Sequence, residues 1–233
     1  MREAILDTVP GDLTCGLVQA LTVLRAGHLG ISSLEGLQNL IGLSELWIRG
    51  NSITDVGQLR GLTNLTSLNL AANSIADISA LSGLTRLQFL AINENEAITD
   101  ISPLRGLTDL TGALWIHNNS ITDISPLSGL TKLTTLNAWE NSITDISALS
   151  ELTSLTHVRL HINSITDINA LEELTNLELV WLSENSDLNS LQPLIDNVGL
   201  GAGVSVNVSS TNVACSDVNL LQARGVAVIS DCP

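Results

Sequence analysis

One short motif recurs along most of this chain at a nearly constant spacing. The letters NSITDIS occupy 119–125 and again 141–147, and the variants NSITDV, NSIADIS and NSITDIN stand at equivalent positions. Aligned on leucine, the 233-residue chain contains eight consecutive units of 22 or 23 residues, the first of them degenerate. Such a chain must fold as a row of equivalent units, because each unit buries its apolar side against its neighbours.

The units share the frame L-x-x-L-x-x-L-x-L-x-x-N-x-I-x-D-I-x-x-L-x-x, whose spacing is typical of leucine-rich repeats. They span 18–39, 40–61, 62–83, 84–106, 107–129, 130–151, 152–173 and 174–196. We therefore predict an α/β fold, a right-handed curved solenoid with a parallel, concave β-sheet built from the x-L-x-L-x segments. The convex side has few residues per unit, so it is expected to carry 3₁₀ or short helical turns.

Two polar positions of the frame are interpreted as architecture. The asparagine falls where the chain turns inward after the strand, and its carboxamide can both donate to and accept from backbone groups there. This predicted structural ladder comprises Asn51, Asn73, Asn95, Asn119, Asn141, Asn163 and Asn185. The aspartate precedes I-S-x-L and fits an N-cap for the convex turn. The predicted caps are Asp55, Asp77, Asp100, Asp123, Asp145 and Asp167, so much of the formal net charge of −15 is a by-product of repetition.

A solenoid needs caps, because its terminal units would otherwise expose leucine to water. We predict a helical N-terminal cap over 1–17, repeats over 18–196 and a C-terminal cap over 197–233. At the amino end, 2–9 and 12–24 are expected to be helical. At the carboxyl end, GVSVNVSS predicts a closing strand, SDVNLLQARG a short helix and VAVISDCP a last strand.

The three cysteines fall in the two predicted caps. Cys215 and Cys232 flank the last helix and strand, and we predict a disulfide between them, which implies an oxidising compartment. The alternative is two free thiols in a cytosolic protein. Cys15 is interpreted as a buried structural thiol. Without a C-x-x-C pair, the cysteines do not predict a zinc site.

The outward positions of the strands vary from unit to unit, yet they hold all four tryptophans, the single phenylalanine and all four histidines. Aromatic and arginine side chains on a rigid sheet are typical of binding surfaces. The candidate ligand-binding residues of the concave face are Trp47, Arg49, Phe89, Trp115, His117, Trp139, Glu140, Arg159, His161 and Trp181. The alternative is that the tryptophans only pair across strands for stability.

Several function classes are disfavoured by composition and spacing. Nine Lys and Arg against 24 Asp and Glu argue against nucleic acid. No run approaches the ~20 apolar residues that membrane insertion needs. His117 and His161 are expected ~9.6 Å apart, two strand spacings, which is too far for one zinc ion. No nucleophile stands beside a base, so we predict no enzyme activity, no metal and no cofactor. The histidines are interpreted instead as groups that make binding depend on pH near neutrality.

The frame, with its S-P-L and S-G-L-T joints, resembles the internalin-like bacterial leucine-rich repeats over about 18–196, and RGVAVISDCP resembles the ends of such domains in secreted or surface proteins. The resemblance implies recognition of another protein through the concave face, with aromatic anchors. It also implies an extracellular or bacterial cell-surface location, although the first residues lack an apolar core long enough for a secretory leader. No immunoglobulin-like domain or wall anchor follows 174–196, which argues against an adhesin role.

From these patterns we predict a non-enzymatic, monomeric binding module with a protein partner. Two alternatives remain open. The first is glycan binding, with tryptophans stacking on sugar rings. The second is a structural scaffold whose concave face has no ligand.

Overall fold

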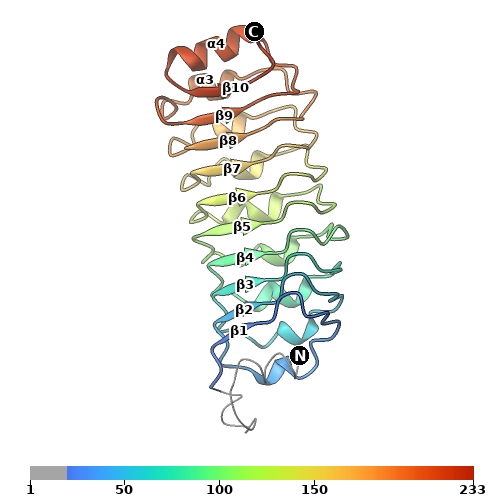
Figure 1. The fold of residues 1–233 in the computed structure, drawn as a ribbon. Helices are drawn as coiled ribbons and strands as arrows, with labels where there is room; N and C mark the ends of the chain where they lie inside the picture. Colours follow the sequence, from blue (N-terminus) through green and yellow to red (C-terminus); the bar gives the residue numbers. More distant parts are fainter. Residues whose placement is uncertain (1–19) are drawn as a thin grey trace.

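Ten three-residue strands form one parallel sheet in the computed structural model, which describes residues 20–233 (Figure 1). Each strand pairs with the next one along the chain, so the spatial order equals the sequence order. The strands are β1 (Val23–Arg25), β2 (Glu45–Trp47), β3 (Ser67–Asn69), β4 (Phe89–Ala91), β5 (Ala113–Trp115), β6 (Thr135–Asn137), β7 (His157–Arg159), β8 (Leu179–Trp181), β9 (Ser205–Asn207) and β10 (Ala227–Ile229).

The register aligns equivalent frame positions. Leu46 of β2 lies opposite Leu68 of β3, and Leu114 of β5 lies opposite Leu136 of β6. These central residues are 0% exposed, as are Val158 and the other central residues from β1 to β9. The sheet therefore keeps one leucine or valine per strand in a continuous aliphatic core, and its flanking residues face outward.

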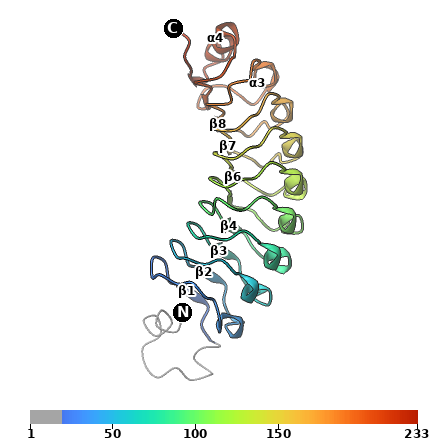
Figure 2. The same ribbon diagram turned by 90° about the vertical axis from the view of Figure 1, so that its right-hand side faces the viewer.

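Short turns line the opposite side of each coil, and the strands follow the inner, concave side of the arc (Figure 2). Pro103 and Pro126 occupy the first turns of their 3₁₀ helices, where a missing N–H costs little. The 3₁₀ helices are η1 (Leu37–Asn39), η2 (Gly57–Leu59), η3 (Ser79–Gly83), η4 (Ser102–Leu104), η5 (Ser125–Gly129), η6 (Ser147–Leu149) and η7 (Asn169–Leu171). The turn behind β8 is instead a short α-helix, α3 (Gln192–Asp196).

The frame asparagines hydrogen-bond each repeat to the one before it. Asn73 Nδ2 donates to the Leu70 carbonyl at 2.9 Å and to the Ile48 carbonyl, one repeat earlier, at 3.1 Å. Its Oδ1 accepts the Ile53 N–H at 3.1 Å. Equivalent bonds occur at Asn51, Asn95, Asn141, Asn163 and Asn185. At Asn119 the Nδ2 bonds persist, but Oδ1 has no partner where the preceding unit carries an extra residue.

The aspartates act one residue earlier than expected. The N-cap position is occupied by the next residue, Ile78 in the case of η3, and Asp77 lies before it. Asp77 Oδ1 accepts the Ser79 N–H at 2.7 Å, which satisfies an unpaired donor at the start of the turn. The same bond forms at Asp55, Asp100, Asp123, Asp145 and Asp167. The prediction that the aspartates are N-caps was therefore wrong by one residue. Each aspartate forms an Asx turn, in which its side chain accepts the N–H of the residue two positions later.

The C-terminal elements lie where the sequence predicts them. β9 is the closing strand, α4 (Cys215–Ala223) the helix and β10 the last strand, and Cys215 is disulfide-bonded to Cys232. At the amino end the helix expected over 12–24 is wrong over its described part: 20–22 are not helical, and the last two residues belong to β1. The rest of the predicted N-terminal cap, 1–17, and Cys15 lie outside the described residues. The domain boundaries stay predictions.

Candidate binding face

Two columns of side chains run along the concave face. The first column is the last residue of each strand, and it includes Trp115 of β5 and Trp181 of β8. The second column is the residue two positions further on, and it includes His117, Trp139 and His161. Both columns come from the frame, because residues spaced by two in a strand share a face.

The second column forms a stack of aromatic rings. Trp139 lies 4.4 Å from His117 and 5.1 Å from His161 between ring centroids, with interplanar angles of 13° and 10°. Since β5 and β7 flank β6, the two imidazoles cover opposite faces of the indole. His161 continues to Trp181 by an edge contact at 5.7 Å. We call His117, Trp139 and His161 the aromatic stack.

A second aromatic group lies nearer the amino end. The rings of Trp47 and Phe89 stack at 5.7 Å although β3 separates their strands. Phe89 then meets Trp115 edge-on at 5.3 Å. The Arg25 guanidinium lies 5.6 Å from the Trp47 ring centroid. The contact across β3 is possible because β3 presents the small Ser67 and Asn69 at its outward positions.

The aromatic stack borders a hollow of about 320 Å³. Its lining residues are Trp115, His117, Asn137, Trp139, Arg159, His161 and Trp181. Six of these seven are sequence-predicted ligand-binding residues, and Asn137 was missed. Glu140, another of the predicted ligand-binding residues, does not line the hollow.

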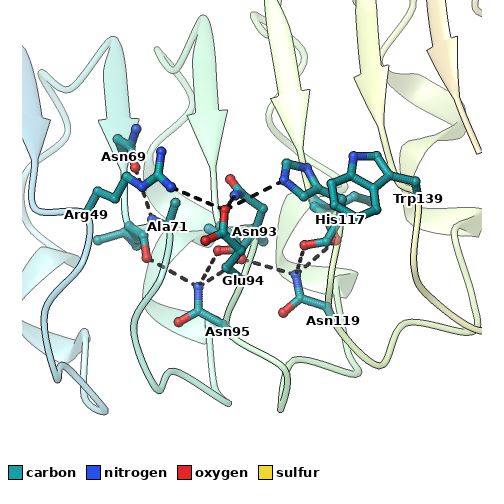
Figure 3. A network of polar contacts seen from close by, with 12 residues as sticks. Arg49, Asn69, Ala71, Asn93, Glu94, Asn95, His117, Asn119 and Trp139 are labelled. Atoms are coloured by element: carbon teal, nitrogen blue, oxygen red, sulfur yellow. Dashed lines mark hydrogen bonds and ion pairs between the residues drawn. The ribbon is translucent and has the colours of Figure 1, made fainter.

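A polar network links the repeat of β2 to the aromatic stack (Figure 3). Glu94 Oε1 lies 3.5 Å from Arg49 Nη2 and 3.9 Å from His117 Nε2. Arg49 therefore reaches from the repeat of β2 to the repeat of β4, and Glu94 connects it to the aromatic stack. Glu94 was absent from the candidate residues, although it shares its frame position with Glu140. It also has a backbone φ of 57°, a left-handed conformation that is uncommon outside glycine.

The two stacked histidines are held in their neutral form. Burial lowers the pKa of His117 to about 4, against the opposing effect of the Glu94 carboxylate. Burial likewise lowers the pKa of His161. The expectation of titration near neutrality is therefore wrong for His117, because desolvation disfavours the imidazolium.

We expect the fold to lose stability as the pH is lowered, already at pH values above those at which carboxylates titrate. The His117 pKa is lower in the folded chain than in the unfolded one. The stability that depends on a neutral His117 is therefore fully present above about pH 6.5 and is lost as the pH falls toward 4. From pH 7 to 5 the free energy of unfolding should fall by about 1–2 kcal/mol. Urea titrations at both pH values measure this change.

His117→Gln should remove most of that pH dependence, and substitution of the exposed His28 should leave it unchanged. The carboxylates at the starts of the convex turns titrate in a separate, lower pH range. The hydrogen bond that the Ser79 N–H donates holds the pKa of Asp77 below 3.8, so the Asp77 carboxylate is protonated only at lower pH. A parent whose stability is equal at pH 7 and 5 would refute the neutral-histidine assignment.

Several polar atoms of the face have no partner among the described residues. They include the indole nitrogens of Trp47, Trp115 and Trp181 and the Nδ1 atoms of His117 and His161, all buried. Among residues 20–233, no cluster of His, Cys, Asp and Glu is suited to hold a metal ion. Within the same range, no helix has the length and apolarity needed to cross a membrane.

A family model described as "Leucine Rich repeats (2 copies)" matches residues 41–83, 63–106 and 113–151. Internalin C2 from Listeria monocytogenes is 32% identical, with 91% of this chain and 90% of that chain covered and a TM-score of 0.80. Internalin F from the same organism is 25% identical, covering 98% and 88%, with a TM-score of 0.57. No curated protein sequence matches significantly.

A more distant structure shares the fold. It is the ectodomain of the plant membrane receptor kinase GASSHO1/SCHENGEN3 from Arabidopsis thaliana, in complex with Casparian strip integrity factor 2. The identity is 20% and the TM-score 0.72, over 93% of this chain and 28% of that chain.

The parallel sheet, the 3₁₀ turns and the asparagine ladder define a leucine-rich-repeat solenoid. The chain belongs to the internalin-like leucine-rich-repeat family. The resemblance inferred from the frame and its joints is thereby confirmed.

Proposed function

We propose that this protein is an extracellular, non-enzymatic module that recognises a protein partner through its concave face. Leucine-rich-repeat proteins of the internalin type are generally binding modules. The observation that carries the proposal is the preformed array of aromatic and arginine side chains over β2 to β8. Such residues bury much area at low entropic cost, which makes them frequent anchors in protein interfaces.

Ring geometry favours a protein over a glycan as the ligand. A sugar ring stacks on an exposed indole face, yet both faces of Trp139 are covered by histidines. Trp181 has the Arg159 guanidinium 5.1 Å from its ring centroid, and Trp47 has both Phe89 and Arg25 against it. These indoles offer mainly edges, which suit apolar side chains of a protein better than sugar faces.

The disulfide between Cys215 and Cys232 supports an extracellular location. Disulfides persist in oxidising compartments and are rare in the cytosol. Cys215 is exposed, so a reducing cytosol would have ready access to this bond. The disulfide therefore supports a location outside the cell or on its surface.

The test is capture of partners by the immobilised protein, followed by affinity measurement with each captured protein. Trp139→Ala should weaken binding by about 2 kcal/mol, roughly 30-fold, because the anchor and its two stacking contacts are lost. Circular dichroism should show that the fold persists, since Trp139 lies outside the aliphatic core.

Lys132→Ala is the matched control. Lys132 is exposed and pairs with Asp109 at 2.8 Å, away from the concave columns. It should bind like the parent protein. A partner that binds Trp139→Ala as tightly as it binds the parent would place recognition elsewhere on the solenoid.

A further inference from the structure

The hollow beside the aromatic stack contains an arginine without a counterion. Three arginines lie in the concave columns. Arg25 lies 3.3 Å from Glu45, and Arg49 lies 3.5 Å from Glu94. Among the described residues, Arg159 has no carboxylate oxygen within 4.0 Å. In a chain with 24 acidic and nine basic residues, the absence of an intramolecular counterion at this position calls for an explanation.

Two contacts fix the Arg159 guanidinium in the hollow. Its Nη1 donates to Asn137 Oδ1 at 2.9 Å, and its Cζ lies 5.1 Å from the Trp181 ring centroid. Both partners are neutral, so they orient the group and leave its charge uncompensated. A guanidinium held in this way loses less conformational entropy when it meets a ligand.

The unused polar groups of Arg159 and Asn137 are donors. Arg159 carries five N–H groups and makes one side-chain hydrogen bond here. Asn137 uses its oxygen to accept that bond, and its NH₂ group has no acceptor among residues 20–233. Neighbouring donors require acceptor oxygens from the ligand, and a carboxylate matches the planar fork of a guanidinium.

The surroundings of Arg159 are apolar rings. Trp115 and Trp181 stand on β5 and β8, ~14 Å apart at three strand spacings, and the aromatic stack borders the side between them. A volume of about 320 Å³ accommodates one or two side chains. The ligand must therefore present an acidic group with apolar groups beside it.

We propose that this hollow receives an aspartate or glutamate of the protein partner, flanked by apolar residues. Its carboxylate pairs with Arg159, and the flanking side chains contact Trp115 and Trp181. Covering Arg159 with a neutral or basic segment would bury an unpaired charge, which is costly. Arg159 is thus the specificity-determining residue of the face. The inference rests on the proposed function, since it requires a protein ligand on the concave side.

The test uses two peptides, acetyl-Gly-Phe-Glu-Leu-Gly-amide and its counterpart with Gln in place of Glu. Their binding to the full chain is followed by NMR of the indole N–H signals. The Glu peptide should bind about fivefold to tenfold more tightly, because its hydrogen bonds to the guanidinium are charge-assisted. Shifts should concentrate on Trp115, Trp139 and Trp181, and leave Trp47 unchanged.

Arg159→Gln should abolish the preference for Glu, and Arg159→Lys should retain part of it, because the charge remains but the fork is lost. Arg25→Gln is the control, since Arg25 also lies against a tryptophan but has its own carboxylate partner. It should keep the full preference. Unchanged unfolding midpoints of the variants show that any loss is local.

Three results would overturn the inference. They are equal affinity for the two peptides, a preference that survives in Arg159→Gln, and no binding of either peptide up to about 10 mM. Binding of glucuronate in the hollow without peptide binding would assign an acidic sugar and overturn it as well. If a protein partner loses its affinity for the Trp139→Ala variant but binds Arg159→Gln as tightly as it binds the parent, that result would support the proposed function and refute this inference alone.

Discussion

Replacing Asn185 by alanine is expected to lower the free energy of unfolding by about 3 kcal/mol. Asn185 is 0% exposed. Its Oδ1 accepts the Ile165 N–H at 2.9 Å, and its Nδ2 donates to the carbonyls of Leu182 at 2.8 Å and Leu160 at 3.1 Å. Alanine leaves all three backbone groups unpaired away from water, and an unsatisfied buried group costs about 1–3 kcal/mol. Urea unfolding of the parent and the variant measures the loss.

Asn141→Ala is the matched comparison. Asn141 makes the same kinds of bond, to Ile121, Ile116 and Ala138, but it is only half-buried, so water can replace part of what is lost. We expect a smaller loss, about 1–2 kcal/mol. If both variants unfold at the parent's midpoint, the asparagine ladder contributes no net stability and the structural assignment fails.

Removal of the Cys215–Cys232 disulfide is expected to destabilise the C-terminal cap by about 3 kcal/mol, the value for a loop of this length. The bond links the start of α4 to the segment after β10, 17 residues apart in sequence. Because each repeat contacts only its neighbours, the effect should stay local. Cys215→Ser/Cys232→Ser is the variant to use.

Hydrogen exchange resolves where the loss occurs. The Ala227 N–H donates to the Val204 carbonyl and the Val208 N–H to the Ile229 carbonyl, at 2.9 and 2.8 Å. Both amides should exchange faster in the variant, whereas Leu114 N–H, in the middle of the solenoid, should keep its protection. Unchanged exchange at Ala227 and Val208 would show that α4 and β10 are held by packing alone.

The two histidines of the aromatic stack show what repeat spacing can predict about a side chain and what it cannot. The sequence put His117 and His161 in one column on either side of Trp139, and ring contacts of 4.4 and 5.1 Å agree with that order. It did not indicate their protonation. Frame position fixes where a side chain starts, but the pKa depends on how much water its neighbours exclude. Burial of the imidazoles is a consequence of the ring stacking.

By itself, the sequence determined the period, the strand in every unit, the inward leucines, and the C-terminal helix and strand. Strict repetition allowed this, because a residue's face in a strand follows from its parity. The sequence predicted the pairing of Cys215 with Cys232 but left free thiols open, and the structure decided for the disulfide. Only the tertiary structure decided which outward side chains touch. It brought Phe89 onto Trp47 across β3, Glu94 onto Arg49, and Asn137 onto Arg159. These contacts depend on rotamers and on the size of intervening residues, such as Ser67, which no repeat frame specifies.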